Sequence, residues 1–181
     1  MHEVNVLETA LEWLSAGRAV CIAHVVETWG SAPRAVGAMM VVDANGAMEG
    51  SVSGGCVEGA VILEAFEALG DGVPRLLEFG VSDDEAFAVG LACGGRIKVL
   101  VEPAQREVLE NLALATENRK PVAYEVNTTD WTRSVTEIDH DTISGMDGAI
   151  FRSAFQPPKR LVVGGAVHIA QPLSMMARLA G

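Results

Sequence analysis

Two short stretches place cysteine beside paired glycines: "SVSGGC" at residues 51–56 and "CGG" at residues 93–95. Glycines admit positive φ angles, and the successive backbone N–H groups of such a turn form a concave site that binds anions. The hydroxyls of Ser51 and Ser53 add hydrogen-bond donors, and a helix after the first turn adds its positive end. This combination of groups suits a phosphate or another oxyanion.

The thiols are the second chemical feature. Cys56 stands near the start of the following helix, where the helix dipole favours a thiolate, and thiolates bind soft metals. If both glycine turns lie at one edge of a sheet, Cys56 and Cys93 can face one pocket, although two cysteines do not complete a structural zinc site. In the alternative interpretation, Cys56 is a small buried residue and its glycines only form a turn. Cys21 and His24 lie in an apolar run, so we expect both in the core, with His24 hydrogen-bonded there.

Arg34 is the only lysine or arginine between Ala19 and Pro74, and it lies within "GSAPRAVG". The planar guanidinium of an arginine in a Gly/Pro turn suits a phosphate. An ion pair with Glu27 or Glu58 is the alternative use of this side chain.

Charged residues lie on both sides of Cys93 in the sequence. Arg96 and Lys98 alternate along one predicted strand, so they share a face, and that face is either a binding surface or an ordinary solvated one. The carboxylates of residues 83–85 are consecutive and cannot all face one site, so a solvated loop is the simpler interpretation.

The elements that must position these residues follow from hydrophobic periodicity. Residues 45–46, Asn-Gly, predict a hairpin whose returning strand leads into the first glycine turn. The predicted helices span 4–16, 57–69 and 104–118, and the predicted strands span 19–26, 38–43, 74–80, 96–103, 121–127, 134–138 and 149–155. Helices that fall between strands predict an α/β or α+β fold, with a mixed sheet and flanking helices.

Composition excludes several classes of protein. The chain has 181 residues, of which 49% are hydrophobic and 20% charged, so we expect a globular protein. A net charge of -11 without a basic stripe argues against nucleic acid as a partner. No apolar run reaches the ~18 residues of a membrane span, and the N-terminus does not resemble a signal peptide. The three cysteines do not form a disulfide framework, so we expect a cytoplasmic protein with reduced thiols.

Four motifs occur along the chain in this order: "GSAPRAVGAMMVV", "GSVSGGCVE", "VGLACGG" and "VLVEP". Together they resemble the N-terminal domain of the xanthine dehydrogenase accessory factor family, also called XdhC/CoxI, over residues 5–103. The resemblance implies a protein that binds the molybdenum cofactor, protects its sulfurated form and delivers it to a molybdenum hydroxylase such as xanthine or carbon monoxide dehydrogenase. The positions that match the motifs are Gly30, Ser31, Pro33, Arg34, Gly54, Gly55, Cys56, Cys93, Gly94 and Gly95.

Molybdopterin carries a phosphate, a dithiolene and a metal centre, which suit an arginine, glycine turns and thiols. We therefore expect the molybdenum cofactor to bind transiently at Ser31, Arg34, Ser53, Gly54, Gly55, Cys56, Cys93, Gly94 and Gly95. The expected partners are sulfur-donating or cofactor-maturing proteins and a molybdenum hydroxylase client subunit. Two alternatives to this accessory role, which is not enzymatic, stay open: a thiol-dependent oxidoreductase that uses Cys56 or Cys93, and an interaction module without a cofactor.

The C-terminal residues 157–181 resemble the first strand, turn and helix of a Rossmann-like domain, so we divide the chain into domains at 1–156 and 157–181. Val167 stands where the dinucleotide fingerprint has its second glycine, and Ala170 stands at the third position. We therefore expect no binding of NAD or FAD, whether the chain is a shortened or a natural short form. A buried strand beginning at Leu161 and the helix after it should dock on the first domain or pair with a second copy, as a homo-oligomer.

Overall fold

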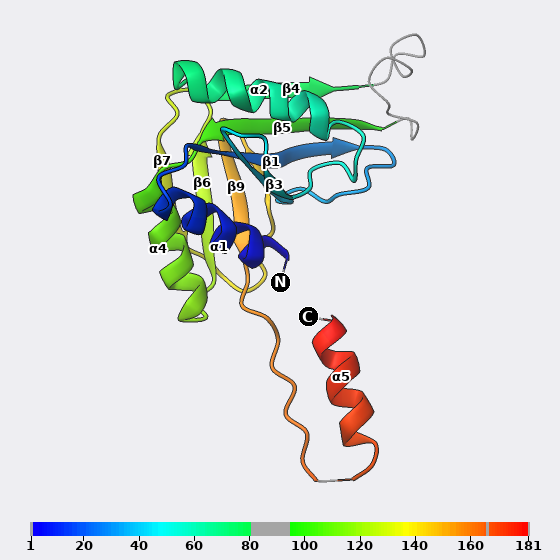
Figure 1. Ribbon diagram of the computed structural model, residues 1–181. Helices are drawn as coiled ribbons and strands as arrows, with labels where there is room; N and C mark the ends of the chain where they lie inside the picture. The colour runs from blue at the N-terminus through cyan, green and yellow to red at the C-terminus, as the bar shows by residue number, and fades with distance from the viewer. Residues whose placement is uncertain (1, 81–94, 166, 181) are drawn as a thin grey trace.

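The computed structural model describes residues 2–80, 95–165 and 167–180 of the chain (Figure 1). Its helices are α1 (His2–Ser15), α2 (Glu58–Asp71), α4 (Arg106–Glu117) and α5 (Ala170–Ala180). Its strands are β1 (Val20–Trp29), β2 (Met39–Asp43), β3 (Met48–Gly50), β4 (Arg75–Phe79), β5 (Arg96–Pro103), β6 (Val122–Asn127), β7 (Arg133–Glu137), β8 (Gly145–Asp147) and β9 (Ile150–Phe155). The expected fold class, with sheets and flanking helices, is confirmed, and β8 is a strand that periodicity did not predict.

The strands form two sheets, with the orders β3-β2-β1-β5-β4 and β7-β6-β9-β8. Every pairing among the described strands is antiparallel, where the sequence predicted a mixed sheet. Short connections explain the pairs β2–β3, β6–β7 and β8–β9, because a hairpin joins only antiparallel strands, whereas β1 and β5 pair antiparallel although they are distant in sequence. The Asn-Gly hairpin is confirmed between β2 and β3, with Gly46 at a φ of 83°.

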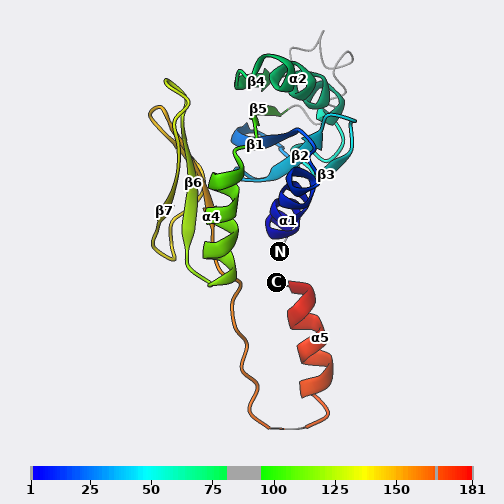
Figure 2. The same cartoon turned by 60° about the vertical axis from the view of Figure 1, so that its left-hand side comes forward.

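The first sheet is covered on both faces, which explains why β1 reads as a continuous apolar run. Helix α2 packs on one face over a core that includes Val25, Val61 and Val99. Helix α1 and the second sheet cover the other face, over a core that includes Ile22 and Phe151, and α4 packs between α1 and the second sheet. Figures 1 and 2 show these layers, with the strands of the second sheet running across those of the first.

A buried polar cluster ties the two sheets together. The Glu102 carboxylate on β5 accepts a 2.7 Å hydrogen bond from the Tyr124 hydroxyl on β6 and a 2.6 Å bond from Nε of Arg133 on β7. Burial raises the pKa of Glu102, and the positive charge of Arg133 opposes that rise. Burial and the neighbouring carboxylate raise the pKa of Tyr124, so its hydroxyl keeps the proton that it donates.

The C-terminal segment departs from the prediction. Helix α5 is confirmed, but no strand forms at Leu161, and Val162 is 89% exposed. A lone strand needs a neighbour for its backbone hydrogen bonds, and this segment lies beside neither sheet. Figures 1 and 2 show α5 apart from the rest of the molecule, and Met175 and Met176 on it are exposed, so docking on the first domain is not observed. Pairing with a second copy stays a prediction.

A helix in the described ranges would span a membrane only if it were long and apolar enough. None of their helices combines the length and the apolar character that crossing a membrane requires.

Candidate functional site

The first glycine turn wraps around a carboxylate of its own chain, that of Glu58 at the start of α2. The backbone N–H groups of Ser53 and Gly54 donate to Oε1 at 2.9 and 3.0 Å, and the N–H of Gly55 donates to Oε2 at 2.8 Å. The hydroxyl of Ser51 donates to Oε1 at 2.6 Å, and the hydroxyl of Ser53 donates to Oε2. The paired glycines allow this closure because both have positive φ angles, 78° and 111°.

The turn is also tied to the helix. The Ser53 hydroxyl accepts hydrogen bonds from the N–H groups of Cys56 and Val57, at 3.0 and 2.9 Å. Burial raises the pKa of Glu58, but the hydrogen bonds from Ser51 and Ser53 outweigh it, and the pKa falls to about 2. Glu58 is therefore ionised at neutral pH, and its charge organises the segment that carries Cys56.

The anion that this glycine turn binds is thus the carboxylate of Glu58 and not an external phosphate. The sequence points to a concave anion site here, and the N–H groups do converge, but their acceptor is internal. The cofactor-binding role of Ser53, Gly54 and Gly55 stays a prediction. For the two glycines it depends on their exposed outer surface, whereas Ser53 is buried and donates both its N–H and its hydroxyl to Glu58. Glu58 is the residue that sequence reasoning missed. An acidic residue directly after a glycine turn, without a nearby cation, was the signal that could have revealed it.

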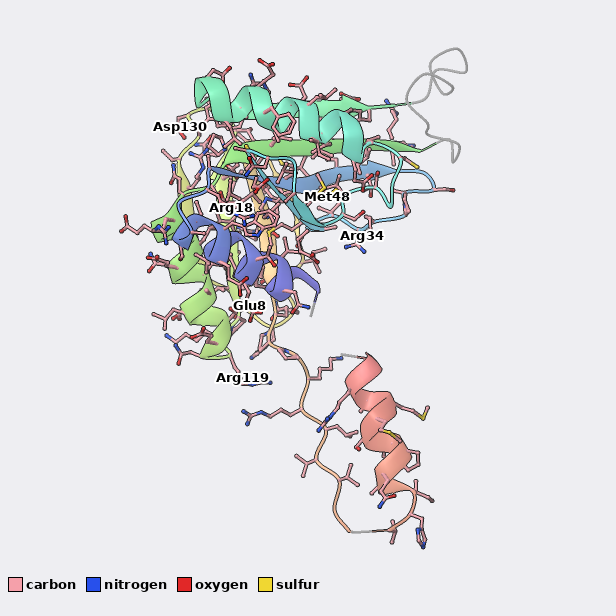
Figure 3. All side chains as sticks on the ribbon, viewed as in Figure 1. Glu8, Arg18, Arg34, Met48, Arg119 and Asp130 are labelled. Carbon is pink, nitrogen blue, oxygen red and sulfur yellow. The ribbon has the colours of Figure 1, made fainter. Side chains whose placement is uncertain are left out.

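Arg34 lies against the same turn (Figure 3). Its Nε donates to the carbonyl of Ser51 at 3.2 Å, and its two terminal nitrogens make no hydrogen bond within the described ranges. Neither alternative ion pair forms, because Glu27 pairs with Lys98 and Glu58 is held by the turn. The guanidinium therefore has donors to offer to an anion.

A third segment reaches the same end of the sheet. A Cβ at the buried Gly95 would lie 3.0 Å from the carbonyl oxygen of Trp29 and 3.2 Å from that of Ser31, so the chain needs glycine for this close approach. Figure 1 shows the end of β1, the turn before α2 and the start of β5 at one end of the first sheet. Ser31, Gly54 and Gly55 are exposed and Cys56 is half-buried. Cys93 and Gly94 lie outside the described residues.

Cys21 and His24 are core residues, as expected. The Cys21 thiol donates to the carbonyl of Ala65 at 3.3 Å, and burial, helped by the negative charge of Glu102, raises its pKa to about 12. His24 is buried between Tyr124 and Phe151, with ring centroids 5.3 and 5.5 Å away. Its expected hydrogen bond is absent, because neither ring nitrogen has a partner among the described residues. Within the same ranges, no group of three His, Cys, Asp or Glu side chains could hold a metal ion.

We expect His24→Leu to stabilise the protein by about 1–3 kcal/mol at pH 7, because it removes two unpaired polar atoms from the core. Burial lowers the pKa of His24 to about 3, from 6.5 in the unfolded chain. As the pH falls from 6.5 towards 3, the unfolded state takes up a proton that the folded state does not, so stability falls by up to about 1.4 kcal/mol per pH unit. Urea unfolding at pH 7 and pH 4.5 measures both effects.

The matched control is His140→Gln, since His140 is exposed and its replacement should change neither value. A His24→Leu protein that is less stable than wild type at pH 7 would show that the histidine has a partner, such as a buried water.

Comparisons with known proteins bear on this arrangement. Residues 13–80 match the model of the XdhC and CoxI family. The expected family resemblance is therefore confirmed, through a segment that holds the first two of the four motifs. The chain is 33% identical over 179 residues, 98% of its length and 55% of the relative, to the molybdenum cofactor insertion chaperone PaoD of Escherichia coli (strain K12).

Two further comparisons agree. The chain is 36% identical over 89 residues to a probable xanthine dehydrogenase subunit of Bacillus subtilis (strain 168), which is 48% of this chain and 27% of that one. A crystal structure described as a xanthine dehydrogenase from Bacillus halodurans matches with a TM-score of 0.76 at 24% identity, over 100% of this chain and 60% of the other. It supports the fold. The chain spans less than two thirds of the length of each of these proteins.

Proposed function

We propose that this chain is an accessory protein that binds the molybdenum cofactor and passes it to a molybdenum hydroxylase. The relative named as a molybdenum cofactor insertion chaperone, which aligns with nearly the whole chain, supports the class of cargo. The observation that carries the proposal is the meeting of two loops at one end of the first sheet. These loops bring Arg34, whose terminal nitrogens have no partner within the described ranges, beside the turn that carries the half-buried thiol of Cys56.

Each group has a role that fits one part of the cargo. The cofactor is an anionic molecule with a phosphate at one end and a sulfur-ligated metal at the other. Arg34 offers a planar pair of donors to the phosphate. Cys56, with Cys93 as the proposed second thiol, offers soft sulfur to the metal–sulfur end. Ser31 and the exposed outer surfaces of Gly54 and Gly55 allow close approach of the ligand to the backbone. The proposed site also includes Gly94 and Gly95.

The role proposed is that of a carrier, without catalysis of its own and without NAD or FAD. A transient complex with a client hydroxylase, such as xanthine or carbon monoxide dehydrogenase, receives the cofactor. A separate sulfur-donating protein supplies the sulfido ligand while the carrier shields it. The division into domains at 1–156 and 157–181 belongs to the same proposal, with the C-terminal segment free to pair with another copy.

Titration calorimetry with purified molybdenum cofactor tests the proposal. Arg34→Ala should weaken binding about ten- to a hundredfold, because a charge-assisted hydrogen bond contributes about 1.5–3 kcal/mol. Cys56→Ser should weaken it as well and lower the molybdenum retained per chain by elemental analysis. Arg106→Ala, which removes an exposed arginine on α4, serves as the control and should leave the affinity unchanged.

If neither Arg34→Ala nor Cys56→Ser alters binding, these loops are not the cofactor site. Thiol-dependent turnover of a small substrate by the purified protein would favour an oxidoreductase, and binding of a hydroxylase subunit without cofactor would favour an interaction module.

A further inference from the structure

A pocket of about 520 Å³ opens between the first sheet and the edge strand β8 of the second sheet. Strands β1, β4 and β5 supply one wall, and Gly145 and Met146 on β8 supply the other. The register of β1 against β5 shifts between Val25 and Glu27, and this irregularity lies beside the pocket. The volume falls within the roughly 300–1,000 Å³ of small-molecule sites. Trp29 ends β1 and Arg96 begins β5, so the pocket lies at the end of the first sheet that carries the candidate loops. It opens on the face turned to the second sheet, where Val26, Val36 and Met146 pack, whereas Cys56 packs on the opposite face with α2.

Two flat side-chain groups line this pocket, the indole of Trp29 and the guanidinium of Arg96. The guanidinium carbon of Arg96 lies 5.4 Å from the centre of the Trp29 ring, in a cation–π contact. Trp29 is nevertheless 71% exposed, so much of the indole remains uncovered. Val36 and Met146 add apolar lining. An exposed indole and a stacked guanidinium at the mouth of a pocket are suited to a planar ring, which can stack on either group.

The charges around the pocket are balanced. Two cations, Arg96 and Lys98, line it together with two carboxylates, Glu27 and Glu78. Lys98 Nζ lies 3.2 Å from Oε2 of Glu27, and Glu78 pairs with Lys98 in the register of β4 and β5. A bare anion would meet both carboxylates here. A neutral ring that carries donors on one edge and an acceptor beside them can satisfy carboxylates and cations together.

The 2-amino-4-oxo edge of a pterin has this pattern, with an amino group and a ring N–H that donate and a carbonyl that accepts. We propose that the pocket between the sheets binds the pterin ring of the cofactor, stacked on Trp29, with its polar edge towards the Glu27–Lys98 pair. This inference rests on the proposed function for the identity of the ligand. It assigns the ring to one site and leaves the phosphate and metal ends to the loops that carry Arg34 and Cys56.

The test uses free pterin, which lacks both the phosphate and the metal. Titration of the full chain should quench pterin fluorescence with saturation. Trp29→Leu should weaken binding by about tenfold or more, because stacking on one aromatic side chain contributes about that factor. Glu27→Gln should also weaken it, because the amide offers a donor to the donor edge of the ring. Lys120→Ala, which changes a second and separate pocket, is the control and should bind pterin as wild type does.

Several results would overturn the inference: no saturable pterin binding by the wild-type chain, equal binding by Trp29→Leu in a protein whose circular dichroism is native, equal binding of adenine, or displacement of pterin by inorganic phosphate. The complete cofactor, titrated in parallel, separates the two proposals. If wild type binds the complete cofactor and not pterin, the pocket assignment fails and the carrier function stands. If wild type binds pterin and not the complete cofactor, the carrier function fails.

Discussion

Glu58→Ala should lower the free energy of unfolding by about 2–6 kcal/mol. The buried N–H groups of Val52 and Ser53 lose their acceptor, and each unpaired buried donor costs about 1–3 kcal/mol. The N–H groups of Gly54 and Gly55 lose theirs too, but these residues are exposed and can bind water instead. Urea unfolding at pH 7 measures the loss.

Two variants make the Glu58 result specific. Glu67→Ala changes an exposed glutamate on the same helix and should cost less than about 0.5 kcal/mol. Glu58→Gln keeps the shape but turns an amide N–H₂ towards donors, so it should be destabilising by more than Glu67→Ala. Similar losses in Glu58→Ala and Glu67→Ala would show that the carboxylate is not what orders the turn.

The same carboxylate gives an acid-side pH dependence. The pKa of Glu58 is about 2 in the folded state, against 4.5 for a glutamate in the unfolded chain. Its stabilisation is therefore complete above pH 4.5 and is lost as the pH falls from 4.5 towards 2. The Glu58→Gln protein should lack this part of the acid destabilisation while keeping the part that begins near pH 6.5, which belongs to His24.

Arg133→Met is expected to lower the free energy of unfolding by about 3–5 kcal/mol, because it leaves the buried Glu102 carboxylate without its cation. The chain offers a matched comparison. Arg152 Nε lies 2.7 Å from Glu125, almost the same distance as the 2.6 Å between Arg133 and Glu102, but the Arg152 side chain is 34% exposed while that of Arg133 is 8% exposed. Arg152→Met should therefore cost about 1 kcal/mol or less.

Thermal and urea unfolding of the two variants measure the difference. Equal losses for Arg133→Met and Arg152→Met would mean that burial does not set the strength of these pairs. The double variant Arg133→Met with Glu102→Leu should recover much of the loss, because it leaves no buried charge behind.

Local patterns were enough to predict most of the fold. The apolar run at 19–26 indicated a buried strand, and the Asn-Gly pair predicted the β2–β3 hairpin. The predictions that were wrong or missing concern strands that depend on partners distant in sequence. The residues from Leu161 have the composition of a strand, but a strand forms only beside another one. The three-residue strand β8 is too short for a periodic signal and exists because β9 pairs with it.

In the candidate site, too, the sequence predicted the local features and missed those that depend on distant residues. Composition alone identified Arg34 as an isolated cation and the glycine–cysteine stretches as turns, and the structure brings Arg34 against the first turn. The role of Glu58 was not predicted, because it depends on a carboxylate that folds back to accept hydrogen bonds from the five residues 51–55. No rule of residue spacing describes that arrangement. The pocket lined by Trp29, Arg96 and Met146 was not predicted, because its walls come from strands of two different sheets.

The internal carboxylate of the first glycine turn has a consequence for how a carrier exchanges its load. Residues 51–55 are already hydrogen-bonded to Glu58 without any ligand, so in the proposed carrier this turn needs no ordering of its own when the load binds. Affinity then depends on the few groups that touch the load directly, and the dissociation rate can be tuned there one side chain at a time. In the proposed carrier, a turn that is held by its own carboxylate can release its load without breaking the hydrogen bonds that shape it.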